Sequence, residues 1–393
     1  MIGRVLLASV LALQASLAPA VQGAAAGSVA GSVAGAAPDC NPPRGQLEVG
    51  EPWAQKRLDP KSVWSLSTGA GVPVAVIDTG VDLTHPQLRL AGKADLVGSG
   101  YRDCVGHGTA VAGIIGAQYV KGVLFHGVAP GARLLSYKFT DTEQNGDTQL
   151  LIKAIKAAAD QGAKVINVSS KTLDHPALET AVRYALAKDA VIVAAAGNIS
   201  RQDGTPSPAY PASYDGVLGV GAAGPEGTLA EFSNTKTPVS VIGPGQDITS
   251  TWPGGAYAKG LDGTSYAAPY VAGVAALVRA RYPSLDQAQV RRRIIATADG
   301  ATGAGKGAGM VNPMLAVSAI LPFEPANAPV VAPPPPTPLP RSAVTKAPPV
   351  DERAIDLAVL VAACAIGLAL LVVAMRVVIP MGRRRGWRPG RPT

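Results

Sequence analysis

Residues 71–77 read Gly-Val-Pro-Val-Ala-Val-Ile and are followed directly by Asp78-Thr79-Gly80. A short apolar run that is rich in β-branched residues and stops at polar ones is typical of a strand buried on both faces of a parallel sheet. Residues 164–168 and 190–195 have the same character. The sequence therefore predicts three buried parallel strands, and the first of them ends at a carboxylate.

Helical patterns lie between these strands and after them. Four such helices are expected, over 147–160, 176–188, about 265–281 and about 285–298. Asp147 can cap the first, and Ser284 with Gln287 matches a capping box for the last. Strands that alternate with helices predict an α/β fold with a mainly parallel sheet flanked by helices. In such a fold, polar residues at the carboxyl ends of the strands form the expected active site.

Composition and charge exclude several classes of protein. The chain has 393 residues, 47% of them hydrophobic and 16% charged, which is enough for the core of a large domain. The 45 glycines and 34 prolines follow no Gly-X-Y period, which excludes collagen, and three cysteines exclude a disulfide-dense miniprotein. The net charge is +8, but six arginines and no acids follow residue 375. The basic charge therefore belongs to a tail, and no nucleic-acid partner is expected.

The N-terminus carries a targeting pattern. Residues 1–20 combine Arg4, an apolar run and the small-residue site Ala18-Pro19-Ala20, as a secretory signal peptide does. A membrane-spanning N-terminus is the alternative, although the run is short and Gln14 interrupts it. Residues 21–50 are expected to form a flexible extension.

A second apolar segment lies near the C-terminus. Residues 357–375 contain no charge and are flanked by acids on one side and arginines on the other. We expect a transmembrane helix over 354–379 and, by the positive-inside rule, a basic cytoplasmic tail over 380–393. A buried core helix is the alternative. The protein is thus predicted to be a single-pass cell-membrane protein with its folded domain outside the cytoplasm.

Between the N-terminal extension and the predicted transmembrane helix, we expect a folded domain over 51–320 and a linker over 321–353. Eleven of the 28 residues 322–349 are proline, which prevents a packed core and favours extended polyproline geometry. The linker is therefore expected to act as a semi-rigid spacer. A ligand for proline-binding modules is the alternative.

The cysteines indicate one disulfide. Cys40 and Cys104 lie in the exported part, where an oxidising compartment lets them pair, and we predict a bond between them. Two free buried thiols are the alternative. Cys364 lies in the apolar C-terminal segment and is expected to be an inert small residue.

Asp78 is the first candidate for chemistry. An Asp-Thr-Gly also marks aspartic proteases, but those need two facing carboxylates, and the chain has no second copy. An aspartate that merely shapes a tight turn is the alternative.

His107, in Gly106-His107-Gly108-Thr109, is the second candidate. Its glycine neighbours allow the backbone to come close and leave the imidazole unobstructed, and histidine is the usual general base near neutral pH. A helix-capping histidine is the alternative. The histidines show no zinc-ligand spacing, so neither a metal nor a cofactor is expected.

Ser265 is the third candidate, in the run Gly263-Thr264-Ser265-Tyr266-Ala267-Ala268-Pro269 before an apolar helical segment. Most serines at a helix N-terminus are caps. Here the positive end of the helix would also favour negative charge that develops beside the hydroxyl.

The order Asp78, His107, Ser265 is that of the subtilisin triad. Residues 74–88, 106–116 and 263–277 resemble the signature blocks of subtilisin-like proteases, and Ala194-Ala195-Ala196-Gly197-Asn198 resembles the block with the oxyanion asparagine. The resemblance implies a serine endopeptidase in which Ser265 is the nucleophile, His107 the base, Asp78 its orienting acid and Asn198 the oxyanion donor.

The same resemblance implies that substrate backbone pairs along Val168-Ser169-Ser170. There the sequence departs from the family, because Lys171 stands where a glycine is usual.

The chain also looks like a mycosin, the membrane-anchored subtilisin-like protease of type VII secretion systems. The features that carry this resemblance are Pro52-Trp53-Ala54-Gln55, Val63-Trp64, the short extension with Cys40, Asp103-Cys104, the proline linker and the C-terminal span. It implies secreted protein substrates and association with the type VII membrane complex. A mainly non-catalytic scaffold of that complex and a general surface protease are the alternatives. The short N-terminus suggests an extension that wraps the domain without blocking the cleft.

Overall fold

The computed structural model describes residues 40–143, 146–199, 206–300, 303–324 and 352–386. The chain divides into two compact units, 1–333 and 334–393. The predicted signal peptide lies outside the described residues, as does most of the predicted linker.

The first unit is built on a seven-stranded sheet with the order β2-β3-β1-β4-β5-β6-β7, and every neighbouring pair is parallel. The strands are β1 (Pro73–Asp78), β2 (Leu90–Asp95), β3 (Arg133–Lys138), β4 (Val165–Val168), β5 (Val191–Ala195), β6 (Leu218–Ala223) and β7 (Val241–Pro244). A separate antiparallel hairpin pairs β8 (Ile248–Trp252) with β9 (Ala256–Leu261). The predicted α/β class with a mainly parallel sheet is confirmed.

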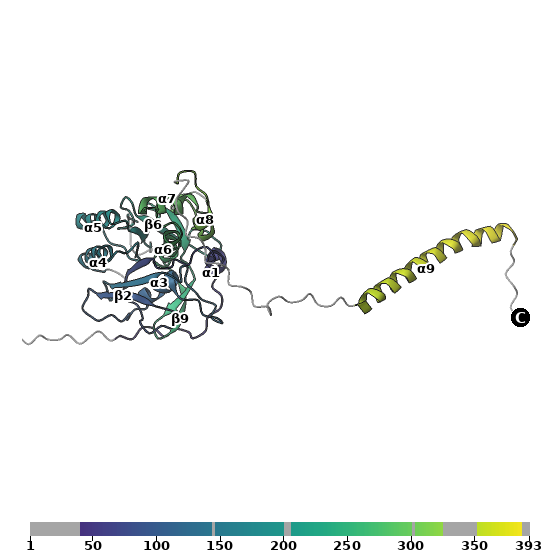
Figure 1. The fold of residues 1–393 in the computed structure, drawn as a ribbon, viewed down its shortest axis with the longest axis horizontal. Helices are drawn as coiled ribbons and strands as arrows, with labels where there is room; N and C mark the ends of the chain where they lie inside the picture. The colour runs from purple at the N-terminus through teal and green to yellow at the C-terminus, as the bar shows by residue number, and fades with distance from the viewer. Residues whose placement is uncertain (1–39, 144–145, 200–205, 301–302, 325–351, 387–393) are drawn as a thin grey trace, which may run out of the picture. The chain divides into compact units, whose positions relative to one another are not determined.

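Helices cover both faces of the sheet (Figure 1). They are α1 (Trp53–Leu58), α2 (Pro60–Val63), α3 (His107–Gly116), α4 (Thr148–Asp160), α5 (Pro176–Ala187), α6 (Thr264–Arg281), α7 (Gln287–Ala296) and α8 (Pro313–Ser318). Along β1, Val74 and Val76 join the core that contains α3 and α6, whereas Ala75 and Ile77 join the core that contains α4 and α5. Side chains that alternate between two apolar cores explain why this strand is apolar throughout.

Helix α6 is apolar on all sides because it lies inside the domain. From Tyr266 to Arg279 all its residues are buried, and it contacts β4, β5, β6 and β7. A helix without a polar face needs such a central place. The sheet and α3 thus hold the first turn of α6 in a fixed position.

The cap predicted for α7 is wrong. Asp286 and Gln289 form the capping box, and α7 begins at Gln287 rather than after Ser284. Two contacts explain the later start: the Leu285 carbonyl accepts from Arg279 Nη1 at 2.6 Å, and Gln287 N donates to Asp189 Oδ1 at 2.7 Å. Two overlapping capping boxes were possible in the sequence, and the tertiary contacts favour the one that begins at Asp286.

The last described residues before 325 contact α7. The buried Arg293 guanidinium contacts the Glu324 carboxylate and donates to the Ala316 carbonyl at 2.5 Å, while Arg292 stacks on the Phe323 ring at 3.9 Å. The first residues of the predicted linker thus contact the domain.

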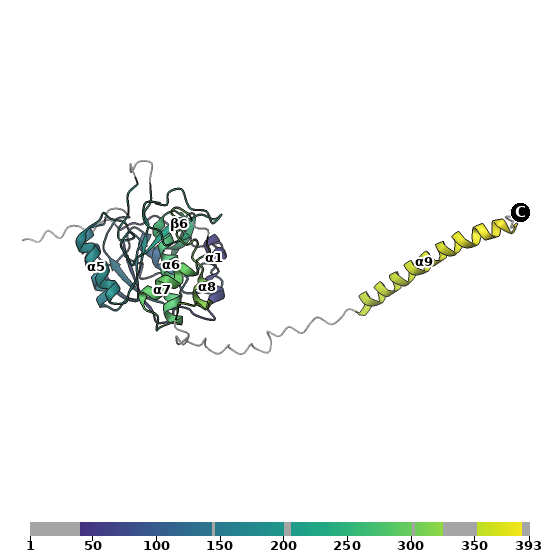
Figure 2. The same cartoon turned by 90° about the horizontal axis from the view of Figure 1, so that it is seen from above.

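The second unit contains α9 (Glu352–Arg384), a continuous helix (Figure 2). Its portion Ile355–Arg384 is long and apolar enough to cross a membrane. The helix includes the predicted span 354–379 and continues into the arginine-rich segment. Helix α9 is therefore consistent with the predicted C-terminal transmembrane helix.

Candidate active site

Asp78 is the last residue of β1, an interior strand of the sheet, and its side chain is buried. Its Oδ1 accepts a hydrogen bond from Thr79 N at 2.8 Å. In the neighbouring strand β3, Lys138 lies in register with it. The carboxylate therefore stands at the carboxyl edge of the sheet, where the sequence predicted the site.

His107 is the first residue of α3, and close packing fixes its place. Gly106 before it has φ +98°, and a Cβ there would lie 2.4 Å from the Trp252 ring. A Cβ on Gly108 would lie 2.0 Å from the Gly80 carbonyl oxygen. Only glycine fits at both flanking positions, as the sequence suggested.

Asp78, His107 and Ser265 come together in one chain of hydrogen bonds. His107 Nδ1 lies 2.7 Å from Asp78 Oδ1, and Nε2 lies 2.9 Å from Ser265 Oγ. A carboxylate only accepts, so Nδ1 carries the proton and Nε2 is left to accept from the serine hydroxyl. The buried Tyr266 ring packs beside the imidazole, with centroids 5.0 Å apart.

The environment of His107 favours its charged form. Burial opposes protonation of the imidazole, but the charge of Asp78 and its hydrogen bond outweigh burial, and Glu143 and Asp103 add to the effect. The pKa of His107 is therefore raised above its ordinary value. A proton accepted from Ser265 would be stabilised there.

Asn198 lies on the opposite side of Ser265. Its Oδ1 accepts from Thr264 N and Thr264 Oγ1, both at 2.9 Å, which leaves Nδ2 as the end of the amide that faces the site. A Cβ built on Gly263 would lie 2.8 Å from Ser265 Oγ and 3.3 Å from Asn198 Nδ2. The hydroxyl and the amide donor therefore border one small space.

The segment Val168-Ser169-Ser170 leads from the sheet to this space. Val168 ends β4 in register with Ile77 and Ala194, and its side chain is in the core. Ser169 is buried, and its Oγ donates to the Ser265 carbonyl at 2.8 Å. Ser170 is partly exposed. Substrate pairing along this segment stays a prediction, and Ser169 has a supporting contact that the sequence did not indicate.

Asp103 is a further residue of the site, which the sequence analysis named only for the mycosin resemblance, without a role in the site. Its buried carboxylate accepts from Thr79 Oγ1 at 2.9 Å, Gly106 N at 2.8 Å and Thr109 Oγ1 at 2.6 Å, and also from the backbone of Val105 and Thr109. Thr79 Oγ1 in turn accepts from Gly108 N at 2.9 Å. Asp103 thus joins the end of β1 to the start of α3. In the sequence, an acidic residue four positions before His107 was the signal that could have indicated this role.

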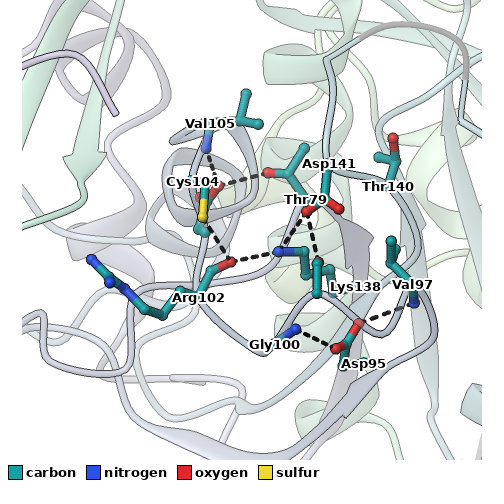
Figure 3. Close-up of polar contacts among 12 residues, drawn as sticks. Thr79, Asp95, Val97, Gly100, Arg102, Cys104, Val105, Lys138, Thr140 and Asp141 are labelled. Atoms are coloured by element: carbon teal, nitrogen blue, oxygen red, sulfur yellow. Dashed lines mark hydrogen bonds and ion pairs between the residues drawn. The ribbon is translucent and has the colours of Figure 1, made fainter. Parts of the chain in front are cut away.

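Lys138 supports the same loop from β3. Its buried Nζ donates to the Arg102 carbonyl at 2.7 Å and pairs with Asp141 Oδ1 at 2.7 Å (Figure 3). A buried ammonium is stable only when it is paired in this way. Lys138 therefore connects the loop before His107 with the loop after β3.

The predicted disulfide is present. Cys40 and Cys104 are bonded, which ties the N-terminal extension to the loop that carries Asp103. The extension then pairs with the hairpin, because Gln46 N and Tyr257 N each donate to the other residue's carbonyl at 2.8 Å. Within the described residues, no cluster of three or more potential metal ligands occurs.

Several known proteins are similar to this chain in sequence. Residues 69–313 match the subtilase family. Mycosin-3 of Mycobacterium tuberculosis (strain ATCC 25618 / H37Rv) is 39% identical over 360 residues, which cover 75% of this chain and 78% of that protein. The chain spans only 60 to 61% of the length of three Bacillus relatives, a thermophilic serine proteinase and two subtilisins.

Solved structures give the same result. The crystal structure of MycP1 from the ESX-1 type VII secretion system superposes on this chain with a TM-score of 0.65. The two are 34% identical in sequence, and the match covers 73% of this chain and 90% of that one. The periplasmic assembly of the ESX-5 inner membrane complex has a TM-score of 0.63 at 31% identity, again over 73% of this chain and 90% of that one. The chain therefore belongs to the subtilase family, in its mycosin branch.

Proposed function

We propose that this protein is a serine endopeptidase that hydrolyses peptide bonds with Asp78, His107 and Ser265. The observation that carries the proposal is the continuous chain of two short hydrogen bonds, 2.7 and 2.9 Å, from carboxylate to imidazole to hydroxyl. Each residue comes from a different element, β1, α3 or α6, and each lies at the carboxyl edge of the sheet. This is the arrangement that activates a serine for attack on an acyl carbon.

The steps follow from the geometry. Ser265 Oγ attacks the scissile carbonyl carbon while His107 Nε2 takes its proton, and the charge of Asp78 stabilises the imidazolium. The oxyanion accepts from Asn198 Nδ2 and from the Ser265 backbone N–H, which has no acceptor within the first turn of α6. His107 then gives the proton to the leaving amine. Water attacks the acyl-enzyme by the same route and restores Ser265.

The proposed setting is the outer face of a cell membrane. In support, α9 is long and apolar enough to span a bilayer, and arginines follow its apolar stretch, which by the positive-inside rule lie in the cytoplasm. The likeness to the ESX-5 periplasmic assembly supports association with a type VII secretion complex and secreted proteins as substrates.

Hydrolysis by the full-length protein in detergent tests the proposed chemistry. We expect Ser265→Ala to lower the rate of casein cleavage by roughly 10⁴-fold or more. Ser284→Ala is the matched control, because Ser284 is exposed and does not cap α7. Equal activity of wild type and Ser265→Ala would refute the proposal.

A second candidate function is a scaffold of the secretion complex, which the same likeness to an assembled complex favours. Export of type VII substrates from a deletion strain that carries either wild type or Ser265→Ala separates the two roles. A need for catalysis predicts that the mutant fails to restore export or substrate processing. Full restoration would assign the essential role to the scaffold.

A further inference from the structure

Lys171 crosses the space beside Ser265. It is the third residue after β4, and its Nζ donates to the Asn198 carbonyl oxygen, 3.0 Å away in the segment after β5. The side chain thus spans the carboxyl ends of two neighbouring parallel strands. Asn198, whose backbone Lys171 holds, is the residue whose amide faces Ser265 Oγ.

The stem and the charge of Lys171 have different surroundings. The stem packs on Gly197, since a Cβ there would lie 3.2 Å from Lys171 Cδ. The residue is exposed, and its hydrogen-bond partner among the described residues is a neutral carbonyl. In the part of the chain that the structure describes, no carboxylate forms an ion pair with it. Among the described residues, therefore, no ion pair neutralises this positive charge.

The position of a bound peptide follows from the proposed chemistry. If Ser265 Oγ reaches the acyl carbon and Asn198 Nδ2 the carbonyl oxygen, the residue that owns this carbonyl, here called the acyl residue, is fixed. Its side chain starts two bonds from the attacked carbon. If the peptide backbone also pairs along Val168-Ser169-Ser170, as the family resemblance implies, this side chain extends between 169–171 and 196–198, the two segments that the Lys171–Asn198 bond joins. Lys171 crosses that space.

We propose that Lys171 makes the enzyme selective for an acidic acyl residue, aspartate or glutamate. This inference rests on the proposed function. When a substrate carboxylate binds, the Lys171 ammonium can exchange its neutral carbonyl partner for a negatively charged one, which is a stronger interaction. A substrate lysine or arginine at the same place would be repelled by the ammonium. The lysine stem on Gly197 also occupies room that a large apolar side chain would need.

The effect has a limited size because water reaches the ammonium. Exposed ion pairs change equilibria by factors of a few, and repulsion of a cation is similar. We therefore expect a preference for glutamate over lysine of about tenfold in kcat/KM. Added salt should reduce it.

The test uses the full-length protein and a proteome-derived peptide library, with cleavage sites read by mass spectrometry. The best-cleaved sequence is then made with Glu, Gln or Lys as the acyl residue, for measurement of kcat/KM. Wild type is compared with Lys171→Met and Lys171→Glu. Lys121→Glu is the control, because Lys121 is exposed in the loop between α3 and β3, which leads to the opposite edge of the sheet.

We expect wild type to prefer Glu, Lys171→Met to lose the charge preference and Lys171→Glu to reverse it, with Lys121→Glu like wild type. The same order of substrates in wild type and Lys171→Glu would overturn the inference and leave the proposed function intact. Absence of any cleavage that depends on Ser265 would overturn both.

Discussion

On one side of Ser265, β1 and α3 bury Asp78 and His107; on the other side, the segments after β4 and β5 expose Lys171 and Asn198. The buried side is held by many bonds, five of them to the Asp103 carboxylate alone. On the exposed side, the lysine–carbonyl bond and the Asn198–Thr264 contacts hold the two side chains, and Ser169 and Gly197 join the same segments to the start of α6. The contrast suggests that proton transfer requires fixed distances, whereas substrate recognition requires access.

The largest effect is expected from the buried side. In Asp78→Asn the amide presents a donor or a neutral acceptor to His107, which removes the charge that stabilises the imidazolium and permits the wrong tautomer. We predict a fall in kcat of roughly 10⁴-fold with little change in KM. Steady-state kinetics on the peptide selected above measures it. A loss below tenfold would mean that the buried side is not the proton-transfer machinery.

Asn198→Asp tests the exposed side with a minimal change. The variant keeps an acceptor for Thr264 but loses the Nδ2 donor and adds negative charge beside the oxyanion. We predict a loss in kcat of at least about 10²–10³-fold at nearly constant KM. Asn198→Ala, which also loses the Thr264 contacts, serves for comparison. Unchanged kcat in both variants would remove Asn198 from the oxyanion site.

Asp103→Asn separates positioning from chemistry. The amide cannot accept all five hydrogen bonds, so we expect a loss of about 1–3 kcal/mol in the free energy of unfolding and roughly ten- to a hundredfold in kcat. Removal of its charge also lowers the pKa of His107. His107 must be neutral to act as the base. The rise of kcat/KM with pH, here called the acid limb of the pH profile, should therefore occur at lower pH in the variant. Destabilisation with normal kcat and an unmoved limb would make Asp103 purely structural.

Glu143→Gln is expected to give the smallest effect. Glu143 is exposed, and its charge contributes to the raised pKa of His107. Wild-type kcat/KM should rise with pH through a pKa above the ordinary imidazole value. In the variant this limb should shift to lower pH while the plateau stays unchanged, and Glu226→Gln, another exposed site, should not shift it. Equal pH profiles for all three proteins would contradict this electrostatic account.

The central strands were predictable from the sequence, whereas the peripheral ones were not. Strands β1, β4 and β5 are apolar except for Asp78 at the end of β1 and Asn167 in β4, because both faces of the sheet are buried there. Strand β2 (Leu-Ala-Gly-Lys-Ala-Asp) lies at the sheet edge, is only partly buried and contains a register shift. Its sequence therefore has neither an apolar run nor a clear alternation, and sequence alone gave no signal for it.

The same distinction holds for the site. Asp78, His107 and Ser265 stand in short motifs at the ends of predicted elements, so their types and order were enough to select them. The contacts of Asp103 with Thr79 and of Lys171 with Asn198 join residues 24 and 27 positions apart. No local pattern encodes such pairs, because the sheet order brings them together.

Reaction with a fluorophosphonate, followed by peptide mapping, tests the central claim most directly. The full-length protein should carry one adduct, on Ser265, and His107→Ala should form it at least about 10³-fold more slowly because the hydroxyl has lost its base. An adduct on another serine, or equal rates in wild type and His107→Ala, would contradict the claim that Asp78, His107 and Ser265 act as one unit.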